Sequence, residues 1–468
     1  MAEKRMTVII EIGSCEVSGA AGYRDSGGRL EVVAYAAEQS GEFIKNGIVR
    51  NIDKTAQCLT NIVNRLEEQL KGASVNKVYV GIGGYTFHST HRTVKRSFDE
   101  ETRITAELVD EMTEECQEAQ SPDKFIIRSI PQEYTVDSML TKDPVGCNCR
   151  NILGDYLNLE ARFSIMDNLA SSFDMAKTSI ADEMVIPLLL ADNVLSDTDR
   201  NLGCALVDMG AGTTTVTVYK GGCLRFLSVI PLGSALITSD LATLGISLGE
   251  AEQIKKTVGI STGKKDEAPY VSESGESFAK ATLALVSRAR FQEIIANVLN
   301  QIKMSGYTDD KLNSGIVFTG GGMEMPGVEA YLGQQAHFPK FRIARSKPDA
   351  VVWSAPDMPM EPKRLVLATL LAAGDDDCVS VAEPRPMEID FTQQEQMSTG
   401  SLFTDEGEDA QAERDRKAAE ESARRREEMN EKKKKEKEKE FLENKPRRKS
   451  IFERIRDKAQ QLMDDENE

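Results

Sequence analysis

The sequence predicts an α/β fold in which one three-strand unit occurs twice. The first copy is expected to have strands at 6–12, 16–22 and 29–36, and the second at 204–208, 213–219 and 224–231. In each copy the first strand ends in a carboxylate, Glu11 or Asp208, and a glycine follows two positions later, Gly13 or Gly210. The two tips are 197 residues apart, and this repetition of the same pattern indicates a duplicated domain.

Helical patterns between and after these units complete the prediction of an α/β layer structure. Apolar residues recur at helical spacing over 53–70 and 281–304, and a further helix is expected over 248–256. Buried strands are expected at 75–82 and 314–319. The segment between the copies reads as an insertion with a charged helix at 106–119 and strands near 125–130 and 157–165.

Length and composition exclude several classes of protein. The chain has 468 residues and a formal net charge of −18, which argues against a nucleic-acid binder because such proteins need a basic face. Eight cysteines and three histidines form no zinc framework, and we interpret the close pair Cys147 and Cys149 as incidental. No stretch approaches about 18 apolar residues, so we expect any membrane contact to be peripheral.

These patterns divide the chain into six expected segments. We expect 1–84 to be a first subdomain with the first hairpin, 85–166 an inserted subdomain for self-association or partner binding, and 167–196 a return to the first half. Residues 197–379 should form the second half, with the second hairpin and a helical subdomain. Residues 380–446 should be a disordered charged linker, since 414–440 holds 21 charged residues in 27. An amphipathic helix is expected over 447–468.

The two hairpin tips predict a phosphate-binding site. Backbone N–H groups and hydroxyls at such tips point at phosphate oxygens, and glycine permits the close approach. Asp208 is the candidate ligand for Mg²⁺, through water, because Mg²⁺ sheds its hydration reluctantly. The alternative for either tip alone is a tight turn with an incidental carboxylate. The candidate phosphate-binding residues are Gly13, Ser14, Cys15, Asp208, Gly210, Gly212, Thr213 and Thr214.

Two further segments supply candidates for the nucleoside. Gly320, Gly321, Gly322 and Met323 follow the strand at 314–319 and offer close backbone approach to a purine and its α-phosphate. Glu252 and Lys255 stand three positions apart on the helix at 248–256, where one face would meet ribose hydroxyls. The alternative for this pair is an ordinary surface ion pair.

The C-terminal segment has the pattern of a membrane-binding helix. Its apolar residues fall within an arc of about 120° on a helical wheel, and 445–458 carries a net charge of +5. Anionic lipid attracts such a segment. The alternatives are a helix that docks on a protein groove, or a basic disordered end. The candidate membrane residues are Arg447, Arg448, Lys449, Ile451, Phe452, Arg454, Ile455, Arg456, Lys458, Ala459, Leu462 and Met463.

The order of these motifs resembles the actin, sugar-kinase and Hsp70 superfamily. Within it the chain resembles the FtsA family, most specifically in Ile-Pro-Gln-Glu-Tyr-Thr-Val-Asp at 130–137 and Asp-Pro-Val-Gly at 143–146. The resemblance covers about residues 5–375 and returns at the C-terminus. It implies an actin-like (ribonuclease H-like) duplicated fold with an inserted α+β subdomain and a disordered charged C-terminal tether ending in an amphipathic helix. Further matches lie at 203–214, 229–231, 237–240 and 315–327.

The resemblance also implies a function. It implies ATP and Mg²⁺ as cofactors, self-assembly into filaments, and attachment to the anionic inner membrane at the division site. The implied partners are the C-terminal tail of FtsZ, the tubulin-like division GTPase, and other divisome proteins. Arg290 and Glu293 are the candidate FtsZ contacts, because Arg-Phe-Gln-Glu at 290–293 resembles the family's Arg-Tyr-x-Glu. The alternative for these two residues is a solvated helix face.

Two departures from the family pattern bear on catalysis. The family's first loop usually reads Asp-Ile-Gly-Thr-Ser-Lys, and here Glu16 stands where that lysine would face the phosphates. Thr215 replaces the aspartate that usually ends the second loop. No catalytic base is therefore identified, and we expect ATP binding with at most weak hydrolysis. The alternatives are an actin-like pilus-assembly adaptor of the PilM type, which lacks this tail, or a small-molecule kinase of the same superfamily.

Overall fold

A computed structural model describes most of the chain as one compact unit. All of the described residues belong to this unit. Within the described part of the chain, no helix is long and apolar enough to cross a membrane. The described residues are 5–118, 123–261, 268–308, 310–335, 339–344, 351–357, 359, 361, 363–380, 450–451, 453–457 and 460.

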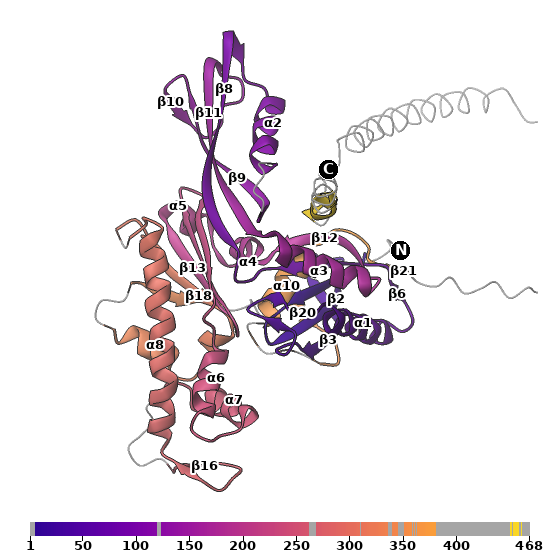
Figure 1. The fold of residues 1–468 in the computed structure, drawn as a ribbon, viewed down its shortest axis with the longest axis vertical. Helices are drawn as coiled ribbons and strands as arrows, with labels where there is room; N and C mark the ends of the chain where they lie inside the picture. The colour runs from indigo at the N-terminus through magenta and orange to yellow at the C-terminus, as the bar shows by residue number, and fades with distance from the viewer. Residues whose placement is uncertain are drawn as a thin grey trace, which may run out of the picture. The chain divides into compact units, whose positions relative to one another are not determined.

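The first half is a six-stranded mixed sheet with helices packed on it (Figure 1). In spatial order its strands are β12 (Ser179–Val185), β7 (Lys77–Ile82), β1 (Thr7–Ile12), β2 (Glu16–Arg24), β3 (Leu30–Gln39) and β20 (Val351–Trp353). Its helices are α1 (Ile52–Gln69), α3 (Phe163–Met175), α4 (Ile186–Val194) and α10 (Lys363–Ala373). Short strands accompany them: β4 (Ile44–Lys45), β5 (Ile48–Val49), β6 (Ser74–Val75) and β21 (Val379–Ser380).

Helix α1 shows how the local sequence builds this half. Asn51 caps it by accepting a hydrogen bond from the amide of Lys54 at 2.9 Å. Its apolar residues at helical spacing are buried against the sheet, with Ile62 beside Gly19 of β2. A Cβ at Gly19 would lie 2.6 Å from Ile62, so the glycine lets the helix approach the strand closely. The helix predicted over 53–70 is thus confirmed.

The second half repeats the same strand order. Its strands are β19 (Phe341–Ile343), β18 (Gly315–Thr319), β13 (Cys204–Met209), β14 (Thr214–Lys220) and β15 (Cys223–Ile230), with a separate hairpin of β16 (Tyr270–Val271) and β17 (Ser277–Phe278). Its helices are α5 (Asp197–Leu202), α6 (Ala235–Ala242), α7 (Leu248–Thr257), α8 (Lys280–Met304), the 3₁₀ turn η1 (Gly321–Glu324) and α9 (Val328–Gly333). The strands and helices predicted for this half are confirmed.

The strand register shows the duplication. Glu11 pairs with Ser18 across β1 and β2, and Asp208 pairs with Thr215 across β13 and β14. Each residue of the second hairpin thus pairs as the residue 197 positions earlier does in the first. Both first strands also have a parallel neighbour, β7 for β1 and β18 for β13. The predicted duplicated fold is confirmed.

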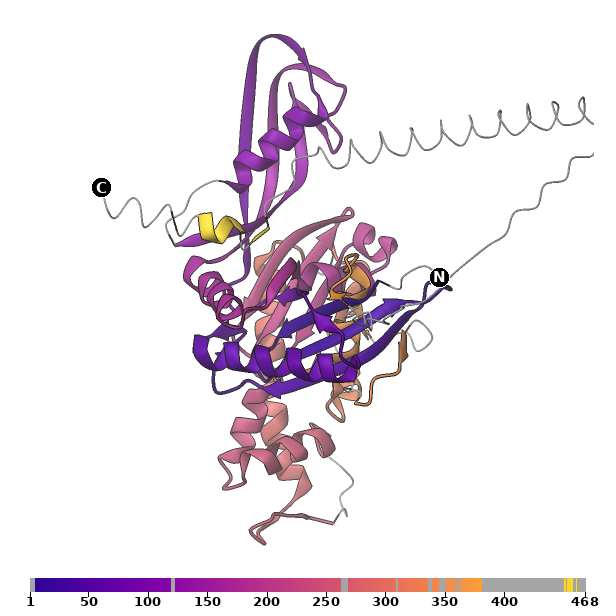
Figure 2. The same ribbon diagram turned by 90° about the vertical axis from the view of Figure 1, so that its right-hand side faces the viewer.

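An α+β subdomain is inserted between the halves. It contains β8 (His88–Arg103), α2 (Ala106–Gln117), β9 (Lys124–Val136), β10 (Met139–Thr141) and β11 (Asn148–Arg162). Its helix packs on the antiparallel strands over a small hydrophobic core of its own. His88 pairs with Ser228 of β15, so the inserted strands extend the second half's sheet to nine strands. Figure 2 shows the long inserted strands rising from this sheet.

One predicted element needs correction. The strand expected over 157–165 ends at Arg162, and α3 begins at Phe163. Apolar residues beyond this point, Met166, Leu169 and Phe173, recur at helical spacing and are buried against the first half. The helical period therefore takes over from the strand period three residues earlier than predicted.

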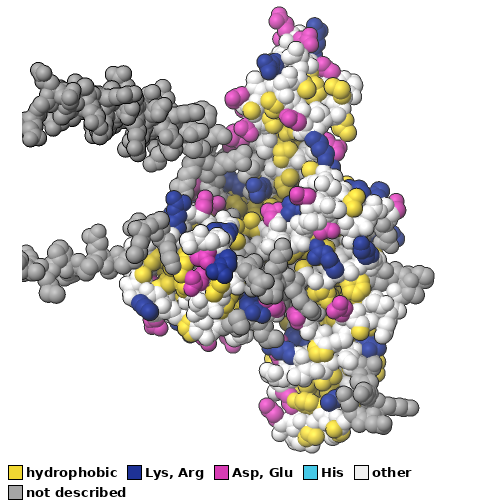
Figure 3. Space-filling model, turned by 180° about the vertical axis from the view of Figure 1, so that it is seen from behind, with side chains coloured by type: hydrophobic (Ala, Val, Ile, Leu, Met, Phe, Trp, Pro, Cys, Tyr) yellow, Lys and Arg dark blue, Asp and Glu magenta, His cyan; other side chains and the backbone are white. Residues whose placement is uncertain are grey.

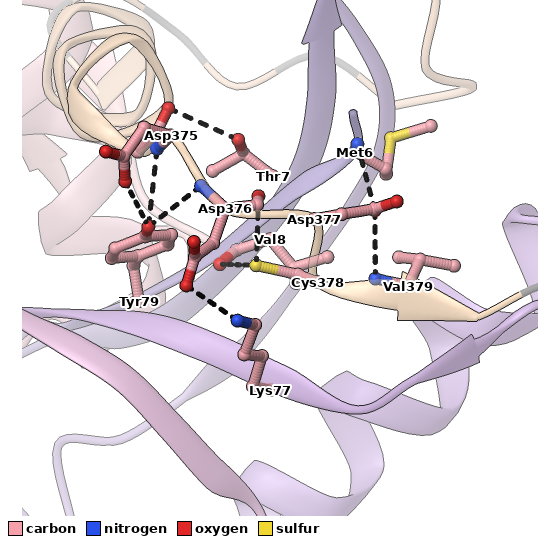
Figure 4. Close-up of polar contacts among 11 residues, drawn as sticks. Met6, Thr7, Val8, Lys77, Tyr79, Asp375, Asp376, Asp377, Cys378 and Val379 are labelled. Carbon is pink, nitrogen blue, oxygen red and sulfur yellow. Dashed lines mark hydrogen bonds and ion pairs between the residues drawn. The ribbon is translucent and has the colours of Figure 1, made fainter. Parts of the chain in front are cut away.

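The last described residues before 381 are bonded to β7 and to the start of β1. Tyr79 of β7 donates a hydrogen bond to the carboxylate of Asp375 at 2.8 Å, and its oxygen accepts one from the amide of Asp376 at 3.0 Å (Figure 4). Lys77 pairs with Asp376 at 2.6 Å. The amide of Cys378 donates to the carbonyl of Met6 at 2.8 Å. Residues 375–378 are thus held to β1 and β7.

Candidate functional site

The tips of the two hairpins touch each other. A Cβ at Gly212 would lie 2.6 Å from the hydroxyl of Ser14, so only glycine allows this contact. Gly13 is equally constrained, because a Cβ there would lie 2.4 Å from the carbonyl oxygen of Glu16. The Ser14 hydroxyl accepts a hydrogen bond from the amide of Gly47 at 2.7 Å. Both tips therefore present closely spaced main-chain groups to the same space.

The second tip is held by the start of α6. The amide of Ser234 donates to the carbonyl of Gly210, and that of Ala235 donates to the carbonyl of Ala211, both at 2.9 Å. Thr214 is fully buried, and its hydroxyl donates to the carbonyl of Leu232 at 2.7 Å. The Thr214 hydroxyl thus supports the loop, while Thr213 lies half-buried at the tip.

A cluster of three carboxylates and one lysine lies beneath the tips. Lys363, the first residue of α10, pairs with Glu11 at 2.7 Å and with Glu16 at 3.6 Å. Its side chain is only 22% exposed. Burial lowers its pKa, but the charges of Glu11 and Glu16 outweigh this and hold the pKa of Lys363 above its usual value. Lys363 on α10 thus places a positive charge beside the first loop, where Glu16 stands in place of a lysine.

The carboxyl group of Asp208 has a raised pKa. Burial, and then the charge of Glu11, raise its pKa to about 6, against the opposing charge of Lys363. Thr319 pairs with Asp208 across β13 and β18, is 1% exposed, and its hydroxyl has no hydrogen-bond partner among the described residues. The half-buried carboxylate and the unpartnered hydroxyl lie side by side and are a polar pair that a bound ligand, metal or water would satisfy.

The glycine turn after β18 approaches the same place. Gly320 has φ of 98°, and a Cβ there would lie 2.4 Å from the carbonyl oxygen of Met209 and 2.6 Å from the carboxylate of Asp208. A Cβ at Gly321 would meet nothing within 4 Å, whereas one at Gly322 would clash with Met209. Met323 is buried in the core of the second half. The turn therefore offers its main chain, and not the Met323 side chain, to a ligand.

Helix α7 brings Glu252 and Lys255 near the first hairpin. Lys255 is buried and pairs with Glu252 at 2.6 Å, and Thr238 donates to Glu252 at 2.7 Å. Burial raises the pKa of Glu252, but the hydrogen bonds from Lys255 and Thr238 hold it below its usual value. Burial and then the charge of Glu252 raise the pKa of Cys15, which places the first tip near α7.

These residues fit a magnesium nucleotide. The glycine tips form a cradle that Cβ atoms would fill, and Asp208 with Glu11 provides the oxygen ligands that Mg²⁺ prefers. Among the described residues no three His, Cys, Asp or Glu side chains converge as a metal cluster. Such an ion would therefore take most of its ligands from water and phosphate, as Mg²⁺ at nucleotide sites does.

Arg290 and Glu293 lie on α8 at a helix junction. Arg290 makes a bidentate pair with Asp240 of α6, at 2.6 and 3.0 Å, and contacts Glu293 at 2.5 Å. Its side chain is 26% exposed, whereas half of Glu293 is exposed. Arg290 thus fixes α8 to α6 and still presents part of its surface to solvent.

Only some of the candidate membrane residues lie within the described part of the chain. Ile451, Arg454, Ile455 and Arg456 are helical, and they contact the inserted subdomain and the first half. The remaining candidates lie outside the described residues: Arg447, Arg448, Lys449, Phe452, Lys458, Ala459, Leu462 and Met463.

Comparison with known proteins identifies the family. The family model for "Cell division protein FtsA" matches residues 205–365, and that for "SHS2 domain inserted in FTSA" matches 84–159. The cell division protein FtsA of Bacillus subtilis (strain 168) is 31% identical over 303 residues, covering 61% of this chain and 67% of that protein. This chain belongs to the FtsA family. FtsA of Porphyromonas gingivalis is 28% identical over 326 residues, 68% of either chain.

A solved structure shares the fold of this FtsA-family chain. The "PilM-PilN type IV pilus biogenesis complex" superposes with a TM-score of 0.52 at 14% identity, covering 78% of this chain and 97% of that one. At this identity the likeness concerns the fold alone. The expected actin-like fold with an inserted subdomain is confirmed.

Two residues of the candidate site could not be predicted from a sequence motif. Lys363 had no motif around it, and the one available signal was the unpaired Glu16 in the first loop, which required a cation from elsewhere. Thr319 directly precedes the glycine turn and was passed over as part of the strand. The structure brings the two tips, the glycine turn and Asp208 together, and places Glu252 near Cys15.

Proposed function

We propose that this chain binds ATP with Mg²⁺ between its two hairpins, assembles into filaments, and holds FtsZ at the inner face of the cytoplasmic membrane during cell division. It would recruit other divisome proteins at the same place. Membership of a family of cell division proteins supports the proposal. The observation that carries the nucleotide part is the lysine–carboxylate cluster beneath two touching glycine tips.

Lys363 takes the part of the hairpin lysine that the first loop lacks. Its ammonium group lies 3.8 Å from the position that a Cβ of Gly13 would occupy, at the base of the phosphate cradle. Phosphate oxygens there would share the cation with Glu11 and Glu16. Asp208 and Glu11 would orient water on Mg²⁺, and the ion would supply charge neutralisation for the phosphates. ATP binding therefore does not depend on a basic residue at position 16.

The membrane part of the proposal is tested by vesicle co-sedimentation. The full chain and a truncation at residue 446 are compared on phosphatidylglycerol vesicles, each with and without Mg·ATP. We expect only the full chain to pellet, and more strongly with Mg·ATP, because filaments bind a surface through many tails at once.

The same experiment separates the alternatives. Equal pelleting of the truncation would contradict a C-terminal membrane foot and favour a pilus-type adaptor. Phosphate release stimulated by a metabolite would favour a small-molecule kinase. Neutral phosphatidylcholine vesicles serve as the lipid control, since attraction of the basic segment requires anionic lipid.

The FtsZ contact is tested at Arg290. We expect Arg290→Glu to weaken binding of an FtsZ C-terminal tail peptide at least tenfold, because the charge on the exposed part of α8 is reversed. Asp240→Asn is the matched control: it weakens the α6–α8 pair while keeping the Arg290 charge. Binding is measured by fluorescence anisotropy on the full chain. Unchanged affinity of Arg290→Glu, or an equal loss in Asp240→Asn, would contradict a direct contact.

A further inference from the structure

The C-terminal helix is seated on the body of the protein. Ser450 opens it with a capping box, in which its hydroxyl accepts from the amide of Glu453 at 3.1 Å and the Glu453 carboxylate accepts from the amide of Ser450 at 2.8 Å. In Figures 1 and 2 this short helix, drawn in yellow, lies beside β12 and the foot of the inserted strands. Its hydrogen bonds reach β9, β12 and α3.

The side of the helix that faces the body is its apolar side. Ile451 and Ile455 are four residues apart and therefore share one face. Ile455 is 1% exposed and belongs to the main hydrophobic core, and Ile451 packs against that core. Both are among the apolar residues that would enter lipid. One face cannot lie in the protein core and in a bilayer at the same time.

Arg454 contacts a β-bulge in β9. The register of β9 against β11 passes from Ile126 to Arg128 while β11 advances by one residue, so Ile127 forms a β-bulge. The Arg454 guanidinium donates to the carbonyls of Ile126 at 3.0 Å and Ile127 at 2.7 Å. It also lies over the ring of Phe125, with its central carbon 4.9 Å from the ring centroid. The bulge thus leaves carbonyl groups that a forked donor satisfies.

Two carboxylates complete the contact at the ends of the described helix. Glu183 of β12 is 8% exposed and accepts a hydrogen bond from the amide of Ile451 at 2.9 Å. This bond satisfies an N–H group of the first turn that has no partner within the helix. Asp174 of α3 pairs with Arg456 on the exposed rim. The rim pair contributes little by itself, because both side chains are largely in water. The buried contacts of Glu183 and Arg454 dominate.

We propose that the surface formed by Phe125, Ile126, Ile127, Asp174 and Glu183, here called the tail groove, is a binding site for the chain's own C-terminal helix. Docking in the tail groove competes with membrane binding for the same helix face, so the protein has a closed form that does not hold lipid. The inference rests on the proposed membrane function. Docking lowers the apparent affinity for vesicles, which equals the affinity of the free helix multiplied by the fraction of helices that are undocked.

The test changes the tail groove and leaves the helix intact. Asp174→Asn combined with Glu183→Gln removes both carboxylates without changing shape. Asp99→Asn combined with Glu101→Gln on β8 is the matched control, since it removes the same charges from exposed positions that make no contact with the helix. We expect the groove variant to bind phosphatidylglycerol vesicles about tenfold more tightly than wild type, the ratio set by one charge-assisted hydrogen bond. The control should match wild type.

Amide hydrogen exchange of the full chain without lipid measures docking separately. We expect residues 451–457 to be protected in wild type and in the control, and to exchange faster in the groove variant. The proposal would be overturned if the helix amides of wild type exchange without protection. It would also be overturned if a variant with a released helix binds vesicles with the same affinity as wild type. If the helix amides are protected but neither wild type nor any variant binds vesicles, the membrane function itself is wrong, and the proposed competition falls with it. This outcome differs from a failure of docking, in which the wild-type helix is unprotected while the protein still binds vesicles.

Discussion

Lys363→Met is expected to unfold the protein at a lower temperature and to abolish ATP binding. The substitution leaves Glu11 and Glu16 without their cation next to a third carboxylate, Asp208. Breaking a largely buried ion pair by removing one partner costs about 3 kcal/mol. ATP binding is lost in addition, because the phosphates then meet three acidic groups, while the nearby Lys255 is already paired with Glu252. Thermal unfolding and titration with a fluorescent ATP analogue measure the two effects.

A second substitution separates stability from binding at this cluster. Glu16→Gln added to Lys363→Met removes one of the stranded charges and should recover part of the thermal stability, while ATP binding stays lost. Lys256→Met, on the half-exposed end of α7, is the control for removing a lysine near the cleft. Wild-type affinity for ATP in a folded Lys363→Met protein would show that this lysine is purely structural.

Asp208→Asn is expected to stabilise the free protein and to impair Mg·ATP binding by about a hundredfold. The folded-state pKa of Asp208 is raised to about 6, so folding favours its protonated form. The stability associated with this group is fully present below pH 4, where both states are protonated, and is lost as pH rises through 6. At pH 7.5 the ionised carboxylate therefore costs about 2 to 3 kcal/mol, which the neutral amide avoids.

The pH dependence of the difference identifies the group. Unfolding free energies of wild type and Asp208→Asn should differ most above pH 7 and converge below pH 4, whereas Asp110→Asn on the exposed face of α2 should follow wild type throughout. Mg·ATP affinity of wild type should rise between pH 5 and 7, because the metal needs the ionised form. If the difference in unfolding free energy between wild type and Asp208→Asn does not change with pH, Asp208 is not the titrating group.

The parts of the molecule that local sequence determines were predictable. The hairpins follow from β-branched strands, period-two patterning and an acid-x-Gly tip, all within 15 residues of one another. The register confirms the repeat residue by residue. Helix α8 follows from its apolar spacing in the same way.

Contacts between distant segments were not predictable. Lys363 neutralises Glu16 from the other end of the domain, so in the sequence the glutamate looked like an unpaired defect. The family motif ending in Asp240 and the candidate partner residue Arg290 were recognised separately, and only the fold shows that they pair. The sequence predicts backbone approach at Met323 from its place after three glycines, but the burial of its side chain in the core depends on packing against distant segments. The bulge at Ile127 depends on strand register, which one strand's sequence does not encode.

The clamp around Tyr79 has a mechanical consequence. The last described residues before 381 are linked to β1, β6 and β7, so a force applied to Ser380 would enter the protein through these strands (Figure 4). β7 lies parallel to β1, and β1 ends at the hairpin that carries Glu11. On the face seen in Figure 3, charged side chains of both signs are interspersed. Force applied at Ser380 would therefore reach the sheet that carries Glu11, and the contacts of Tyr79 and Lys77 would be the first to bear it.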